Sequence, residues 1–138
     1  MDTTFYLTTT GDLYGCGYNG GGQQGDGTTT TPSSFTKRAE NVKDAFISGN
    51  TTFYLTTTGD LYGCGSNAYG QQGDGTTNNV LTFTKRAENV KSVSVSTVTT
   101  FYLTTTGELY GCGNNSNGQQ GNNGSTIEVE SFTKKVVK

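Results

Sequence analysis

The chain has 138 residues, room for about one ordinary domain, with a net charge of −2 and few large apolar side chains. A net negative charge does not attract nucleic-acid phosphates, so we expect no direct nucleic-acid binding. No apolar run reaches the roughly 18 residues that a membrane span requires, so we expect no membrane insertion. The N-terminus lacks the positive and apolar regions of a signal peptide. An intracellular protein is expected, cytoplasmic or cytoskeletal rather than nuclear.

The first segment of the chain is also the start of a repeat. Thr3–Gly17 (TTFYLTTTGDLYGCG) recurs unchanged at Thr51–Gly65, and Thr99–Gly113 differs from it only at Glu108. A second block, Phe35–Lys43, recurs unchanged at Phe83–Lys91. Its third copy, near the C-terminus, is only partly conserved and is shifted by one position because the preceding loop has one extra residue around Asn123. The offset between Thr3 and Thr51 sets the period at 48 residues, which predicts supersecondary units that stack on one another, with boundaries at residues 1–42, 43–90 and 91–138.

One unit contains four strand-like segments rich in Thr, Tyr, Phe and Val, which favour a pleated, half-buried surface. In the second unit they are Asp44–Ser48, Thr52–Thr57, Asp60–Cys64 and Leu81–Arg86. Gly59 lies between two of them and can take the positive φ of a tight hairpin. Four strands form a propeller blade. The fold class expected is all-β, a partial β-propeller of three four-stranded antiparallel blades, the first lacking one strand, with no α-helix.

A long loop rich in Gly, Asn and Thr follows the third strand of each unit, and it differs most between the copies. Rigid amphipathic Tyr side chains in such a loop are suited to interfaces, although packing over the neighbouring loop is the other interpretation. The residues predicted to bind a partner are Tyr18, Asn19, Asn67, Tyr69 and Asn117.

Groups that usually carry catalysis are scarce. The chain has no His, which removes the commonest general base and metal ligand. Cys16, Cys64 and Cys112 fall at the same point of each repeat, so we interpret them as free, small hydrophobic residues. We expect no enzyme activity, no catalytic residue, no cofactor and no metal.

Three further repeated patterns have structural interpretations. Asp26 and Asp74 each lie within Gly-Asp-Gly, which indicates a tight turn rather than a calcium loop because no nine-residue spacing follows. The Gln pairs, such as Gln71 with Gln72, are predicted to be buried amides that bond backbone at the blade junction. The Lys-Arg pairs, each followed by Glu, are predicted to form a solvated face with internal charge compensation.

The order of elements resembles the regulator of chromosome condensation repeat over nearly the whole chain. In the second copy the matching stretch is Gly49–Gly73, with Gly-x-Gly, Asn and Gly-Gln-x-Gly in sequence. The family usually has His and Trp where this chain has Thr51 and Cys64. The resemblance implies a seven-bladed ring whose relatives serve as guanine nucleotide exchange factors, chromatin readers, enzyme inhibitors or scaffolds, and none of those functions maps onto a residue here.

Three blades fall short of the four to eight of a closed propeller, so open end faces are expected. Three outcomes stay open: two chains form a six-bladed ring, other polypeptides complete the arc, or the chain is a fragment of a longer product. Each makes it a component of something larger. The sequence therefore predicts a non-catalytic protein-interaction or scaffold module, a structural subunit of an intracellular assembly such as a cytoskeletal or chromatin-associated complex. Its partners would be proteins that complete the open edges, with a homo-oligomer as one form. The alternative function is guanine nucleotide exchange on a small GTPase.

Overall fold

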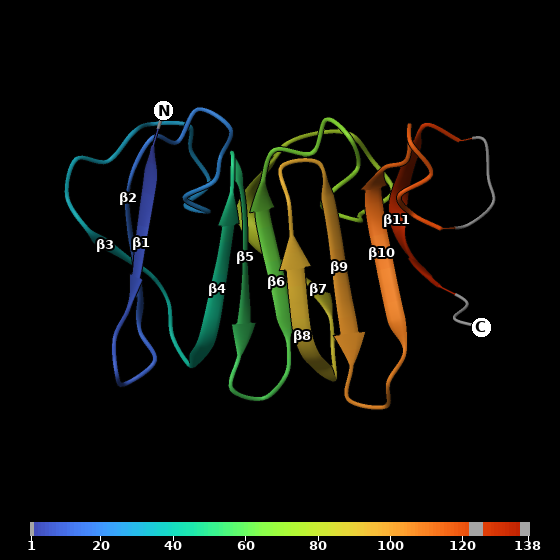
Figure 1. Ribbon diagram of the computed structural model, residues 1–138. Coiled ribbons are helices and arrows are strands. Elements are labelled where there is room, and N and C mark those ends of the chain that lie inside the picture. Colours follow the sequence, from blue (N-terminus) through green and yellow to red (C-terminus); the bar gives the residue numbers. More distant parts are fainter. Residues whose placement is uncertain (1, 122–125, 136–138) are drawn as a thin grey trace.

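The computed structural model describes residues 2–121 and 126–135, which form three antiparallel β-sheets and no helix (Figure 1). The sheets have the orders β1-β2-β3, β4-β5-β6-β7 and β11-β10-β9-β8, and we call them blades 1, 2 and 3. This part of the chain holds no helix long and apolar enough to cross a membrane. The strands are β1 Thr3–Leu7, β2 Leu13–Gly17, β3 Thr36–Ala39, β4 Val42–Ser48, β5 Thr51–Thr56, β6 Leu61–Gly65, β7 Val80–Ala87, β8 Val90–Val95, β9 Thr99–Thr104, β10 Leu109–Asn114 and β11 Glu128–Lys134.

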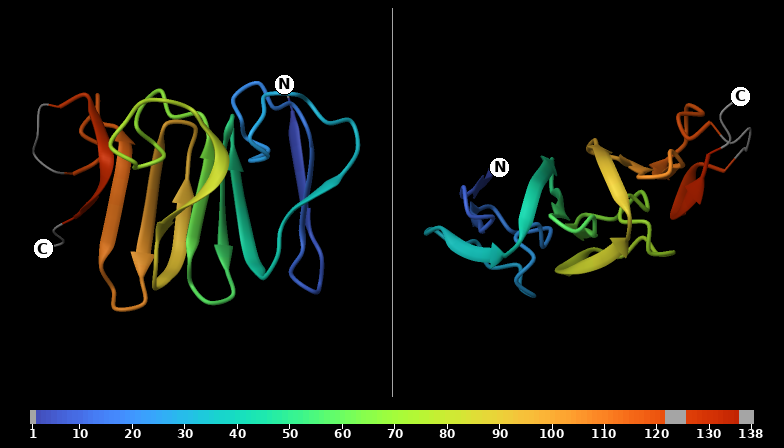
Figure 2. Two further views of the ribbon diagram at one scale, coloured as in Figure 1. Left: turned by 180° about the vertical axis from the view of Figure 1, so that it is seen from behind. Right: turned by 90° about the horizontal axis from the view of Figure 1, so that it is seen from below.

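The blades stand side by side in chain order, and the view from below shows them arranged along an arc (Figure 2). The long loops after β2, β6 and β10 lie together at one end of the blades, which we call the loop end (Figure 1). The tight turns β1–β2, β5–β6 and β9–β10 lie at the opposite, hairpin end. The predicted all-β class, the three sheets and the missing strand of the first blade are confirmed.

Aromatic side chains pair across the strands of every blade. In blade 2, Tyr54 lies opposite Tyr62 and their rings stack at 5.0 Å, while the edge of Phe83 meets Tyr54 at 4.8 Å. The same trio recurs in the other blades. Cross-strand aromatic pairs of this kind stabilise a sheet and fix its register. The hairpin turn is also as predicted, since Gly59 has a φ of 88°.

Strand alternation gives each blade two apolar faces. In β5, Phe53 and Leu55 point toward blade 3 and join a buried cluster with Val90 and Tyr102. Tyr54 points the opposite way and packs with Leu13 and Val42 at the junction with blade 1. The core therefore lies between the blades, as predicted for the repeated aromatic and Leu positions, and no blade can bury its faces alone.

Polar groups complete each junction. The Cys64 thiol donates to the Gln23 carbonyl at 3.5 Å across the first junction, and the Cys112 thiol donates to the Gln71 carbonyl at 3.4 Å across the second. The loop of blade 1 also pairs with the outer strand of blade 2, because the Gly27 N–H donates to the Leu81 carbonyl at 2.8 Å. Each long loop thus supplies a short extra pairing to the next blade.

A buried Asn holds each long loop in shape. The Asn67 amide donates to the carbonyls of Thr76 and Asn78, both at 3.0 Å, and its oxygen accepts from the Gln72 N–H at 2.8 Å. The side chain is fully buried. A single amide therefore ties together loop segments 5 to 11 residues away in sequence and satisfies carbonyls that have no strand partner.

The two Gln side chains of the pair in blade 2 bond different parts of the structure, one within its own blade and one in the next blade. The Gln72 amide donates to the Cys64 carbonyl within blade 2 at 2.7 Å, whereas the Gln71 amide donates to the Thr97 carbonyl of blade 3 at 3.2 Å. The predicted burial of these amides is confirmed at Gln23, Gln24, Gln71, Gln72 and Gln120. Gln119, in the last of the three described blades, is exposed.

The Gly-Asp-Gly segments form tight turns, as predicted. The Asp74 carboxylate accepts from the Thr76 N–H at 2.9 Å and from the Thr76 hydroxyl at 2.8 Å. Burial raises the pKa of Asp74, but the hydrogen bonds from Thr76 outweigh it and the net pKa lies below the usual value. In the third copy the corresponding Asn122 and Asn123, with the extra residue of that loop, lie outside the described residues.

Replacing Gly73 by Ala is expected to destabilise the chain by about 2 to 4 kcal/mol. Gly73 has a φ of 70°, and an added Cβ would overlap the ring of Phe132 in blade 3. Gly107 is the control: its φ is 88°, but no described atom lies within 4 Å of an added Cβ. Gly107→Ala should therefore cost only the backbone strain, about 1 kcal/mol, in urea denaturation. If both variants lost the same free energy of unfolding, the blade junction would not require a residue without a side chain at Gly73.

Asn67→Ala should lower the free energy of unfolding by about 2 to 4 kcal/mol, because the carbonyls of Thr76 and Asn78 lose their donor and a cavity opens at the buried side chain. The comparison variant is Asn79→Ala, which removes one acceptor from the exposed side of the same loop, where Asn79 Oδ1 accepts from the Asn67 N–H at 3.1 Å. A loss below about 1 kcal/mol is expected there, measured by thermal unfolding. If both variants lost the same stability, the buried amide would not be what organises the loop.

Candidate functional site

An exposed aromatic side chain lies in the long loop of blade 2, at the loop end. Tyr69 is 40% exposed, at the tip of the loop of blade 2. Its backbone N–H donates to Gln71 Oε1 at 2.9 Å, and Gln71 in turn bonds blade 3. The framework of the blade junction therefore fixes the backbone that carries the Tyr69 ring. A rigid, exposed Tyr loses little conformational entropy on binding, which suits it to a protein interface.

Tyr18, predicted on the same grounds, is placed differently. It is half-buried, and its ring occupies the space that a side chain at Gly20 would fill. The ring therefore packs over its own loop and keeps one part exposed. Its role in partner binding stays a prediction, as does that of Tyr69.

The three predicted Asn residues are also placed differently from one another. Asn117 is exposed at the tip of the third loop. Asn19 and Asn67 are fully buried, and their amides bond the carbonyls of their own loops. Any contribution of these two to partner binding comes through the loop shape that they hold. The third loop has its buried Asn at Asn115, whose amide donates to the Thr126 carbonyl at 2.9 Å.

Acidic side chains accompany Tyr69 at the loop end. Asp74 lies in the same loop, and Glu130 stands beside it, since the Gly75 N–H donates to the Glu130 carbonyl at 2.8 Å. Glu128 precedes it in β11. The Glu130 side chain is exposed and Glu128 is half-buried. Arg86 offsets part of the Asp74 charge. Glu128 and Glu130 therefore give this part of the loop end a surplus of negative charge, which attracts positively charged partners.

The basic pairs differ from the prediction in one respect. Lys37 is exposed and pairs with Glu40 at 2.6 Å, so charge compensation is confirmed for the Lys. The prediction of a solvated face is wrong for Arg38, whose side chain is only 7% exposed. Arg38 turns inward, where its Nε donates to Gln24 Oε1 at 3.1 Å and its Nη1 lies 3.4 Å from Asp26. Neighbouring strand residues point to opposite faces, which separates the two side chains.

The repeated cysteines take part in packing. Cys64 and Cys112 are fully buried at the two junctions and form no disulfide. Burial raises the pKa of both thiols far above the usual range, so they stay protonated at neutral pH. Cys16, in the first of the three described blades, is only half-buried.

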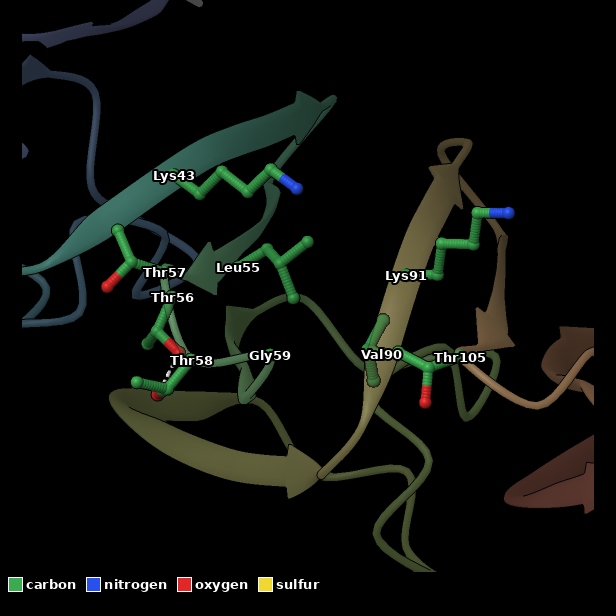
Figure 3. Close-up of a pocket in the computed structure, with 9 residues that line it drawn as sticks. All are labelled: Lys43, Leu55, Thr56, Thr57, Thr58, Gly59, Val90, Lys91 and Thr105. Atoms are coloured by element: carbon green, nitrogen blue, oxygen red, sulfur yellow. Dashed lines mark hydrogen bonds between the residues drawn. The ribbon is translucent and has the colours of Figure 1, made fainter.

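A hollow of about 280 Å³ lies at the hairpin end between blades 2 and 3 (Figure 3). Its floor is apolar, with Leu55 and Val90, and Lys43 and Lys91 extend from neighbouring strands beside it. Hydroxyl groups of the hairpin turns complete the wall, including Thr58. Such a lining is suited to a carboxylate side chain with an apolar stem.

Two features of these surfaces were not predicted from the sequence. The lysine pair could have been found, because Val-Lys recurs at the same offset in the Phe35–Lys43 and Phe83–Lys91 blocks. The buried Asn115 could have been found by aligning the loops from the repeated Gly-x-Gly, since Asn19, Asn67 and Asn115 are equivalent. Asn117 occupies the position of Gly21 and Tyr69, so the Asn itself is not repeated in the other copies.

Structural comparison places the whole chain on larger propeller proteins. Human WBSCR16 superposes with a TM-score of 0.83 at 22% identity, over 97% of this chain and 37% of that protein. Prp20p from Saccharomyces cerevisiae, in a structure described together with its binding to Gsp1p and histones, gives 0.79 at 21% identity over 96% and 36%. Yeast Prp20 bound to Kap60 gives 0.76 at 22% identity over 97% and 35%. The chain thus spans little more than a third of these proteins.

The sequence comparison agrees with the fold. The model of the regulator of chromosome condensation repeat matches residues 42–71 and 90–119, which start at β4 and β8 and end in the long loops of blades 2 and 3. No curated protein matches the chain. The partial propeller predicted from the sequence is confirmed, and the predicted resemblance to the regulator of chromosome condensation repeat is confirmed for these two stretches.

Proposed function

We propose that the chain is a non-catalytic protein-interaction module, a structural subunit of a larger intracellular assembly, whose loop end binds a basic protein surface. The observation that carries this proposal is the exposed Tyr69 ring, held on a loop that the Gln71 amide ties to the next blade. Interfaces typically depend on a few aromatic anchors of this kind, surrounded by a polar rim.

Charge supports the choice of partner. The chain has a net charge of −2, and Asp74 and Glu130 lie together beside the Tyr69 loop. Electrostatic complementarity mainly accelerates association and excludes wrongly charged partners. A basic protein surface therefore fits the loop end better than an acidic one, and direct binding to nucleic acid or a membrane is not part of the proposal.

The structural neighbours point in the same direction. The structure of Prp20p is described with its binding to Gsp1p and histones, and the other Prp20 structure contains Kap60. The matched part is 36% of the Prp20 chain in the first structure and 35% in the second, so Prp20 is nearly three times as long as the part that this chain matches. Protein binding on a propeller of this type is thus our proposal for this chain, with a cytoplasmic or cytoskeletal assembly as its setting and further proteins completing the open edges.

Core histones serve as the basic probe. Immobilised chain should retain them at low salt, and Tyr69→Ser should weaken retention about tenfold or more, since loss of an aromatic anchor typically costs ~2 kcal/mol or more. The dissociation constant is measured by biolayer interferometry over a salt series. The substitution changes no charge, so a change in affinity reflects loss of the Tyr69 ring rather than a change in the electrostatic attraction between the chain and histones.

The control variant is Thr58→Ser at the hairpin end, which keeps a hydroxyl and should bind histones as the native chain does. A Tyr69→Ser chain that folds normally by circular dichroism and still binds histones with native affinity would contradict the proposed site. Absence of histone binding by the native chain at low salt would reject a basic partner.

Guanine nucleotide exchange is the second candidate, favoured only by the resemblance to the regulator of chromosome condensation repeat. We expect no acceleration when the chain is added to a small GTPase loaded with a fluorescent guanine nucleotide. The release rate with and without the chain decides the point. A concentration-dependent acceleration would replace the scaffold proposal with an exchange function.

A further inference from the structure

Blade 1 carries an end face that is buried in the other two blades. We define this blade 1 end face by Tyr6, Tyr14, Cys16 and Phe35. Tyr6 is 44% exposed, whereas the equivalent Tyr54 and Tyr102 are each 8% exposed. Phe35 is 48% exposed, although the equivalent Phe83 packs against the bare backbone of Gly25. The side chains that define the face are of the same types in every copy, and no other described blade packs against them in blade 1.

Blade 3 carries the complementary face. We define this blade 3 end face by Phe101, Leu103, Leu109 and Gln119. The first three are partly exposed, while the equivalent Phe53, Leu55 and Leu61 in blade 2 are buried. Gln119 bonds Asn114 of its own loop instead of the next blade, and Gly121 meets no described atom where the equivalent Gly73 meets Phe132.

We propose that a second copy of this chain covers these faces head to tail, with the blade 1 end face of one copy packed on the blade 3 end face of the other. The proposal rests on the proposed interaction function and names a partner for the open edges; it uses a surface separate from Tyr69. The same two kinds of face already bind each other twice within the chain, at the junctions of blades 1 with 2 and 2 with 3.

The internal junctions specify the contacts expected between copies. Cys64 donates to the carbonyl of Gln23, and Cys112 to that of Gln71. By the same geometry Cys16 of one copy donates to the Gln119 carbonyl of the other. Phe35 covers Gly121, as Phe83 covers Gly25. The side chains that define these faces recur in each copy, so a second copy fits them better than an unrelated apolar surface. Blade 1 has no counterpart of Val42 and Val90, which β4 and β8 bring to the internal junctions.

The predicted contact is heterologous, since two different faces meet. Such a contact closes into a ring or extends into a longer array according to the rotation at each step. In either case the mass of the native particle exceeds that of one chain, and Cys16 becomes buried in the contact. Cys64 and Cys112 are already buried within a single chain and provide an internal reference.

The first experiment measures thiol alkylation under reducing-agent-free, anaerobic conditions at increasing protein concentration, with each Cys followed by peptide mass spectrometry. We expect Cys16 to react about tenfold more slowly at high concentration than at low concentration, in step with a rise in mass by light scattering, because association follows mass action. Cys64 and Cys112 should stay unreactive throughout. A Cys16 rate that does not change with concentration, together with the mass of one chain, would overturn the proposal.

The second experiment breaks one face at a time. Tyr6→Lys disables the blade 1 end face and Leu103→Lys the blade 3 end face, so each variant alone should have the mass of one chain. A mixture of the two still contains one intact pair of faces and should form a particle of two chains. Association by Leu103→Lys alone would instead indicate contact between two blade 1 end faces and reject the head-to-tail arrangement.

The two proposals can fail separately. Tyr69→Ser, the variant that tests histone binding, should associate with itself as the native chain does. A chain that binds histones but stays monomeric would refute only the self-association, and a chain that associates without binding histones would refute only the loop-end proposal.

Discussion

Burial of one blade by the next is the interaction on which this structure depends. Strand alternation places Phe53 and Leu55 on one side of blade 2 and Tyr54 on the other, so a single sheet exposes two apolar faces to water. Hydrogen bonds within the sheet cannot compensate for that exposure, because apolar burial is the main favourable contribution to folding. The stability of each blade is therefore largely a property of its neighbours, as in other repeat proteins.

Polar groups make the junction specific. The apolar clusters alone would tolerate sliding, but the Gln71 amide reaches one carbonyl of blade 3 and the Cys112 thiol reaches one carbonyl of blade 2. The Gln71 amide has partners for both its nitrogen and its oxygen, and a displaced arrangement would leave these buried groups without them. The same amide supports the backbone of Tyr69, so the loop surface and the blade packing are fixed by one set of bonds.

Much of this fold was predictable from residues because the repeat supplies its own comparison. Strands β4 to β7 were found within a few residues of their bounds, and the hairpin Gly59 and the buried Gln pairs follow from their recurrence. Loop side chains were less predictable. Asn19 looked like a surface residue, yet it bonds carbonyls 9 and 11 positions away, and the inward turn of Arg38 depends on Gln24 and Asp26. The contacts of Asn19 and Arg38 depend on the path of an irregular loop, so no periodic sequence pattern predicts them.

The cysteine contacts have a consequence for how such a protein can change in evolution. Cys64 with Gln23, and Cys112 with Gln71, are separated by the same 41 positions. Unequal recombination that inserts or deletes one whole 48-residue unit keeps that separation at every surviving junction. The number of copies can therefore drift while the chemistry between neighbours stays constant. Shorter insertions are confined to the long loops, where the copies of this chain already differ.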